Sequence, residues 1–196
     1  VFLKKKRNIF QIGFYLNFDV LYKNNRPASI NGELCHPFVS SIISDKYKLN
    51  CLLCVTSLIN LSIIEGQKVN DIYKISNDFI ELMFFEKKWF KDFCLFLFKL
   101  LKIIGYEIDY SANTNSIYFE LEKLEFCNTE SIRTIKFPYN LLDKKNSTIN
   151  LIQVNQIFKI FENVFEKNHL SNFNLHLPNQ FLLFKKLIIQ KLNRSE

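Results

Sequence analysis

The segment WFKDFCLFLFKLLKIIG, residues 89–105, constrains the fold of this chain more than any other stretch. Apolar residues cover most of its helical circumference, and Gly105 ends the run, as glycine commonly does after a helix. The polar positions are Lys91, Asp92, Lys99 and Lys102. A helix that is apolar on most sides must be surrounded by other elements, so residues 89–104 are predicted to form the buried centre of a helical domain.

Other helices are predicted on both sides of this segment. Their ranges are about 49–64, 69–85, 150–166 and 178–193. Gly66 is expected to stop the first of them, and Pro178 suits the first turn of the last. With only four glycines and four prolines in 196 residues, the chain has few turn-forming residues for a purely β protein.

Residues 8–23 alternate between apolar and polar positions, which predicts a half-buried strand. The apolar side of this strand would carry Phe14, Leu16, Phe18 and Val20, and the other side Asn17 and Asp19. The sequence NNRP at 24–27 predicts a turn, and Asn31-Gly32 a second possible hairpin turn. Residues 34–43 could continue as strand.

A short strand pair is predicted at 116–127, after a connecting loop. The predicted fold class is therefore α+β and mostly helical. A partial antiparallel β module at 1–45 would precede a helical domain at 46–196.

The net charge of +7 indicates an anionic partner. Lysine, asparagine, isoleucine and phenylalanine are all abundant, which is typical of AT-rich coding, so clustering of charge is better evidence than its total. The one compact cluster is Lys4, Lys5, Lys6 and Arg7, followed at the far end of the predicted strand by Lys23 and Arg26. Basic residues beside exposed aromatic side chains bind single strands by neutralising phosphates and stacking bases. A solvated hairpin tip is the alternative interpretation of the cluster.

No motif for catalysis is present in the sequence. The three histidines, His36, His169 and His176, lack metalloprotease spacing and are expected in surface or capping roles. The glycines stand too far apart for a phosphate-binding loop, so neither an enzyme activity nor a cofactor is predicted. Alternation along a strand explains Glu120, Glu122 and Glu125 better than a metal site does.

The five cysteines are odd in number and lie mostly in apolar runs, which favours buried free thiols in a reducing cytosol over disulfides. The pair Cys51 and Cys54 is interpreted as part of the core. Residues 51–64 are too short for a membrane span, which needs about 20 residues. Residues 93–104 are interrupted by two lysines, and no signal peptide pattern is visible. The prediction is a cytoplasmic protein without a membrane partner.

The order and spacing of these features resemble the DNA repair protein RecO. The basic cluster followed by IFQIGFYLNFDVLYK resembles the later part of the oligonucleotide-binding (OB) fold of that family. The segment WFKDFCLFLFKLLKIIGYEID resembles its central helix. The matching positions are Trp89, Phe93, Leu100, Leu101, Gly105, Tyr106 and Asp109. The segments YFELEKLEF and PNQFLLFKKLIIQKL suit the later part of the family.

Two departures from the family qualify this resemblance. Many RecO proteins carry a four-cysteine zinc site after the Gly-Tyr segment, but residues 110–115 contain no cysteine and Cys127 stands alone. A member without zinc or another metal is therefore predicted. The first strands of the family's OB fold have no counterpart before Val1, so the β module is expected to be partial.

The resemblance implies a recombination mediator associated with the bacterial nucleoid. Such a protein binds single-stranded and duplex DNA, anneals complementary strands, pairs with RecR and helps RecA displace single-strand-binding protein, without covalent chemistry. The cluster Lys4–Arg7, with Lys23 and Arg26, would contact DNA. The acidic, Phe-ended tail of single-strand-binding protein would dock on the helical domain, where Lys99 and Lys102 are candidate contacts.

Two other classes of protein remain as alternatives. One is a helical protein-interaction module that binds no nucleic acid. The other is a fragment of an enzyme whose active site lies in another part.

Overall fold

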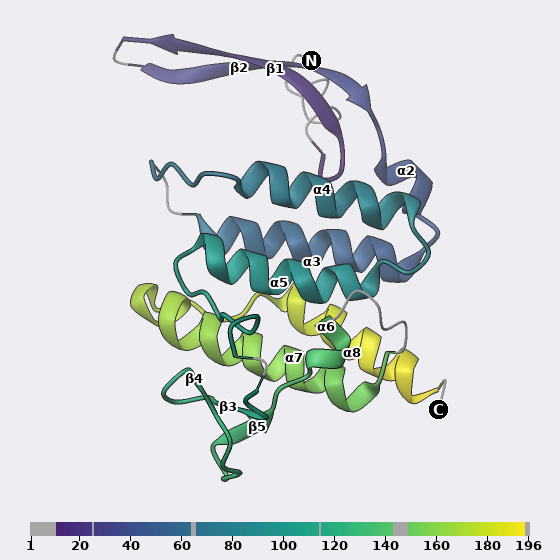
Figure 1. Cartoon of the computed structure of the whole chain (residues 1–196). Coiled ribbons are helices and arrows are strands. Elements are labelled where there is room, and N and C mark those ends of the chain that lie inside the picture. Colours follow the sequence, from purple (N-terminus) through teal and green to yellow (C-terminus); the bar gives the residue numbers. More distant parts are fainter. Residues whose placement is uncertain (1–10, 25, 64–65, 114, 143–148, 195–196) are drawn as a thin grey trace.

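The computed structural model describes residues 11–24, 26–63, 66–113, 115–142 and 149–194, with Lys23 and Arg26 described by their backbone only. The strands are β1 (Tyr15–Lys23), β2 (Arg26–His36), β3 (Tyr118–Glu120), β4 (Glu125–Cys127) and β5 (Thr134–Lys136). The helices are α2 (Val39–Ile42), α3 (Lys46–Ser62), α4 (Ile72–Phe85), α5 (Phe90–Ile103), α6 (Tyr139–Leu142), α7 (Leu151–Val164) and α8 (Asn179–Asn193). A long hairpin lies at one end of the stacked helices and a small sheet lies at the other (Figure 1). The prediction of an α+β, mostly helical fold is confirmed.

Helix α5 is the buried centre of the helical part, as predicted. Phe93, Leu97, Leu100 and Leu101 are all inaccessible to solvent. The helix contacts α4, α6 and α7, so its apolar circumference is covered from several sides.

Local residues explain three of the boundaries of helices α3 and α8. The Asp45 carboxylate accepts hydrogen bonds from the first backbone N–H groups of α3 and caps that helix. The helix ends at Ser62 because Ile63 takes an extended backbone conformation, so the predicted stop at Gly66 is wrong. Pro178 directly precedes α8, where its missing N–H group costs no helical hydrogen bond.

Strands β1 and β2 form an antiparallel hairpin whose turn falls within NNRP, as predicted. Because this first turn sets the register, Asn31 and Gly32 lie inside β2, opposite Asp19 and Phe18, and the predicted second turn is wrong. The predicted strand at 34–43 ends at His36. Pro37 has no N–H group for the ladder, and the chain turns there into α2.

The register gives the hairpin one apolar face and one polar face. The apolar face carries Leu16, Phe18, Val20, Ile30 and Leu34. The polar face carries Asn17, Asp19, Ser29, Asn31 and Glu33, with Leu21 opposite Ser29 as its one apolar residue. The sequence predicted the correct side for the apolar residues, and their burial only in part. Leu16 and Val20 are half-buried, whereas Phe18 is 61% exposed.

The base of the hairpin is attached to the helices by aromatic packing and one hydrogen bond. The Tyr15 ring meets the Phe38 ring with centroids 4.8 Å apart, and its hydroxyl donates to Asn77 Oδ1 on α4 at 2.5 Å. Partial burial, with a smaller contribution from the charge of Glu81, raises the pKa of Tyr15 to about 12. The hydroxyl therefore stays protonated and can donate this bond at neutral pH.

Gly13 precedes β1 with a φ of +84°, and a Cβ atom there would lie 2.8 Å from Leu52 Cδ2 and 3.0 Å from Val39 Cβ. We expect Gly13→Ala to destabilise the protein by about 1–3 kcal/mol from backbone strain, plus the cost of moving these neighbours. Gly105→Ala is the matched control, because Gly105 has a φ of +93° with nothing within 4 Å of the added Cβ. Urea denaturation of both variants measures the difference. If both variants lost the same free energy of unfolding, the close approach of Gly13 to Leu52 and Val39 would contribute nothing to stability.

The small sheet has the strand order β4-β3-β5. The pair β3–β4 was predicted, whereas β5 and α6 were not, because three or four residues are too few to show a periodic pattern. No helix in the described parts of the chain is both long and apolar enough to cross a membrane.

Candidate functional site

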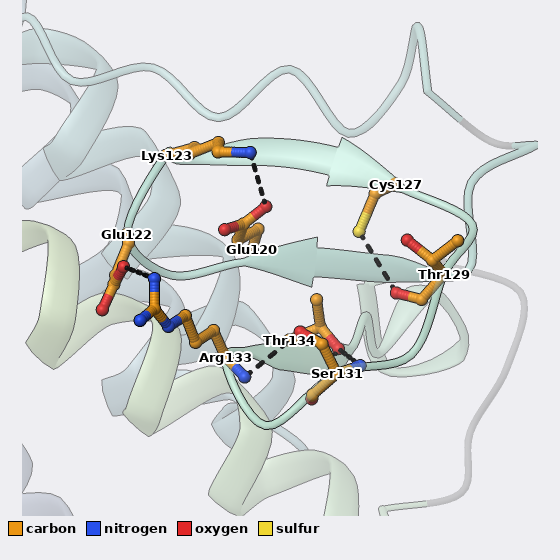
Figure 2. Close-up of polar contacts among 8 residues, drawn as sticks. All are labelled: Glu120, Glu122, Lys123, Cys127, Thr129, Ser131, Arg133 and Thr134. Carbon is orange, nitrogen blue, oxygen red and sulfur yellow. Dashed lines mark hydrogen bonds and ion pairs between the residues drawn. The ribbon is translucent and has the colours of Figure 1, made fainter.

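Two of the three glutamates at 120–125 in and beside the small sheet, Glu120 and Glu122, pair with neighbouring cations. Glu120 lies 3.6 Å from Lys123 Nζ, and Glu122 lies 2.7 Å from an Arg133 guanidinium nitrogen (Figure 2). The Cys127 thiol contacts the Thr129 carbonyl oxygen at 3.6 Å (Figure 2). Within the described ranges, no three histidine, cysteine, aspartate or glutamate residues are grouped so that they could hold a metal ion.

Three cysteines and His169 are buried in the helical part, where burial and hydrogen bonding determine their chemistry. Cys51, Cys54 and Cys94 are fully buried, and burial raises the pKa of each thiol, so the reactive thiolate is disfavoured. The interpretation of Cys51 and Cys54 as core residues is confirmed. His169 was expected at the surface or at a cap. It is buried, at 6% exposed, and it caps α3, because its partner Leu61 lies in the last turn of that helix. Its Nε2 atom lies 2.8 Å from the Leu61 carbonyl oxygen, which can only accept, so Nε2 donates.

The hairpin brings two of the predicted DNA contacts together. Lys23 and Arg26 are register partners at the closed end of the hairpin, away from its junction with α2 (Figure 1). Tyr22, the preceding residue, is 86% exposed. We call residues 22–26 the hairpin tip. The predicted cluster Lys4–Arg7 lies outside the described residues.

The polar face of the hairpin is unsuited to an anion. It carries the carboxylates of Asp19 and Glu33, which would repel phosphates. The apolar face has no charged residue among its six paired positions, of which Gly32 is one. A nucleic acid strand would therefore be favoured at the tip and along the apolar face.

Lys99 and Lys102, the predicted partner contacts, line one shallow cavity of about 220 Å³ at the end of α5. Lys102 Nζ donates to Glu107 Oε1 at 2.5 Å, and this hydrogen bond raises the pKa of Lys102. Asp109 lines the same cavity, and a hydrogen bond from Ser111 lowers the pKa of its carboxyl. Two lysines thus face two carboxylates, which leaves no excess of positive charge for an acidic peptide.

A larger cavity of about 630 Å³ lies between the start of α5 and the last turns of α8. We call it the basic groove. Its charged lining consists of Lys87, Lys88, Lys91, Lys191 and Asp92. Its apolar lining consists of Trp89, Phe90, Leu95, Ile149, Ile188 and Leu192. Among the described lining residues, four lysines stand against one carboxylate, beside the buried side chains of Trp89, Phe90 and Ile188. Such a lining suits a ligand that is both acidic and apolar.

The basic groove was not predicted, although part of its signal is visible in the sequence. Lys87, Lys88 and Lys91 fall within five residues around Trp89. Lys191 lies about a hundred residues further along the chain and joins them only through helix packing. In Figure 1 the hairpin lies on the α4 side of the helices and α8 lies on the opposite side, so the hairpin tip and the basic groove are separate surfaces.

No protein-family model matches the chain, and no curated protein or solved structure shows significant similarity to it.

Proposed function

We propose that the protein is a recombination mediator of the RecO type. It binds single-stranded and duplex DNA through the hairpin tip and the Lys4–Arg7 cluster, anneals strands, and acts with RecR in loading RecA in the bacterial cytoplasm, at the nucleoid. The observation that carries this proposal is the backbone pairing of Lys23 with Arg26 at the end of a hairpin strand in which the preceding residue, Tyr22, is exposed. Cations for phosphates and an aromatic ring for bases are the two components of a sequence-independent single-strand site.

The DNA-binding part is tested by separating charge from stacking. Lys23→Ser/Arg26→Ser is expected to flatten the salt dependence of oligothymidine binding by about 1.4 units, since each lost single-strand phosphate contact removes about 0.7. Tyr22→Ala is expected to lower affinity at every salt concentration and leave the slope unchanged, because stacking releases no counterions. Fluorescence anisotropy across a salt series measures both.

The matched control for the charge variant is Lys136→Ser/Lys159→Ser, which removes the same charge from exposed positions on β5 and α7. This control is expected to leave the slope unchanged. An equal change in both double variants would mean that net charge alone drives binding, and the hairpin tip would lose its role.

The acidic, Phe-ended tail of single-strand-binding protein is proposed to bind in the basic groove. Its carboxylates would meet the four lysines, and its terminal ring would pack beside Trp89. The charge balance of the described lining residues favours this groove over the cavity of Lys99 and Lys102, where two lysines stand against two carboxylates.

A fluorescein-labelled peptide with several aspartates before a C-terminal phenylalanine distinguishes the two cavities. Lys87→Glu/Lys88→Glu is expected to weaken its binding about tenfold, because each exposed attraction is replaced by a repulsion. Lys99→Glu/Lys102→Glu makes the same charge change at the other cavity and is expected to change binding less than about twofold. The reverse order would place the tail at the end of α5.

The basic groove also favours a second candidate function, a protein-interaction module that binds no nucleic acid. Peptide binding by a protein that shows no affinity for DNA at low salt would select this second function.

A further inference from the structure

Tyr47, in the first turn of α3, contacts Lys191, one of the lysines that line the basic groove. The ammonium nitrogen of Lys191 lies 4.2 Å from the centroid of the Tyr47 ring, within the range of a cation–π contact. The backbone N–H of Tyr47 donates to Asp45 Oδ1 at 2.9 Å, and its ring packs against the hydrophobic core. The position of the ring is therefore fixed by the capped start of α3 and by packing against the core. Lys191 contacts a ring whose position is already set.

Lys191 differs from the other lysines of the groove in its position. Lys87, Lys88 and Lys91 come from the start of α5 and the segment before it, whereas Lys191 comes from α8. A ligand with several carboxylates would thus be held from two walls. Among the lysines that line the groove, Lys191 is the one contributed by α8.

We propose that Tyr47 is a positioning residue that orients Lys191 toward an acidic ligand in the basic groove; this inference rests on the proposed function of that groove. A lysine side chain loses considerable rotamer freedom when it is fixed in one geometry. A ring that already restricts Lys191 in the free protein reduces the loss on binding.

The test is a double-mutant cycle with the fluorescein-labelled acidic peptide. Tyr47→Leu is expected to weaken binding about two- to fivefold, the range of an exposed cation–π contact. Tyr47→Phe keeps the ring and is expected to bind like the unaltered protein. In a Lys191→Gln background, Tyr47→Leu is expected to have no further effect, because its role acts through Lys191.

Lys46, whose nitrogen lies 5.1 Å from the same ring, provides the charge control. Lys46→Gln removes a cation from the ring without touching the lining of the groove, and is expected to leave binding unchanged. An independent measurement on the free protein is the ring-current shift of the Lys191 ε-methylene protons, which is expected to disappear in Tyr47→Leu and persist in Tyr47→Phe.

The outcomes separate this inference from the proposal on which it rests. Peptide binding with equal effects of Tyr47→Leu in both backgrounds would overturn the role of Tyr47 and leave the groove intact. Absence of peptide binding by the unaltered protein would overturn the groove and the role of Tyr47 together.

Discussion

Replacing Phe93 by alanine is expected to lower the free energy of unfolding by about 3–5 kcal/mol. Phe93 is fully buried on α5, and its ring centroid lies 6.0 Å from that of Phe79 on α4, 6.3 Å from Phe158 on α7 and 4.9 Å from Phe184 on α8. The three neighbouring rings belong to three other helices, which cannot all shift inward, so the cavity would stay largely open. Urea denaturation followed by far-UV circular dichroism measures the loss.

The matched control is Tyr73→Ala on α4, which removes an aromatic ring that is 76% exposed. Its expected effect is within about 0.5 kcal/mol, because little buried surface is lost. If Phe93→Ala were as mild as this control, α5 would not be the centre of the core.

Replacing Lys4, Lys5, Lys6 and Arg7 together by serine is expected to flatten the salt dependence of single-strand binding by about 2–3 units. Four contiguous cations can each neutralise a phosphate, and each such contact contributes about 0.7 to the slope. Binding should weaken for every sequence, because phosphate contacts carry no base preference. The midpoint of urea denaturation should barely change, since exposed charges contribute little to stability. Anisotropy with oligothymidine and with mixed-sequence strands measures the effect.

A control of equal charge is the replacement of Lys136, Lys159, Lys167 and Lys186 by serine. All four are exposed in the sheet and helices remote from the hairpin. An unchanged slope in the first quadruple variant would identify Lys4–Arg7 as a solvated tip. Equal flattening in both would instead assign DNA binding to the net charge of +7.

The helices could be predicted because each is a long segment with a periodic apolar pattern. Contacts between segments that lie far apart in the sequence could not be predicted. A helix that is apolar on most sides, such as α5, is stable only in the core, and Phe93 is buried as expected. Alternation likewise gave the correct side for Phe18 on β1, but whether that side is covered depends on residues far from the strand. His169 is buried because Tyr106, Phe165 and the Leu61 carbonyl meet around it, and no local pattern reports that meeting.

Some residues of the candidate sites could be identified from local charge, whereas others are brought in only by helix packing. Local charge identified Lys23 and Arg26, which the hairpin does bring together. The basic groove depends on the packing of α8 beside the start of α5, so Lys191 carries no signal in its own neighbourhood. Pairing with Glu107 similarly offsets the charge of Lys102, and this follows from the turn after α5.

The hairpin tip and the basic groove share no residue, and this has a consequence for ligands that are themselves connected. A DNA strand and an acid-tailed protein already bound to that strand would reach the two surfaces without competing for space. Once one of them is engaged, the other is held nearby at an effective concentration set by the length of the tether between them. Such bivalent engagement can raise the apparent affinity by roughly 10²–10⁴ without any contact between the two surfaces. The protein would then distinguish coated DNA from bare DNA by avidity, with each single interaction remaining weak and reversible.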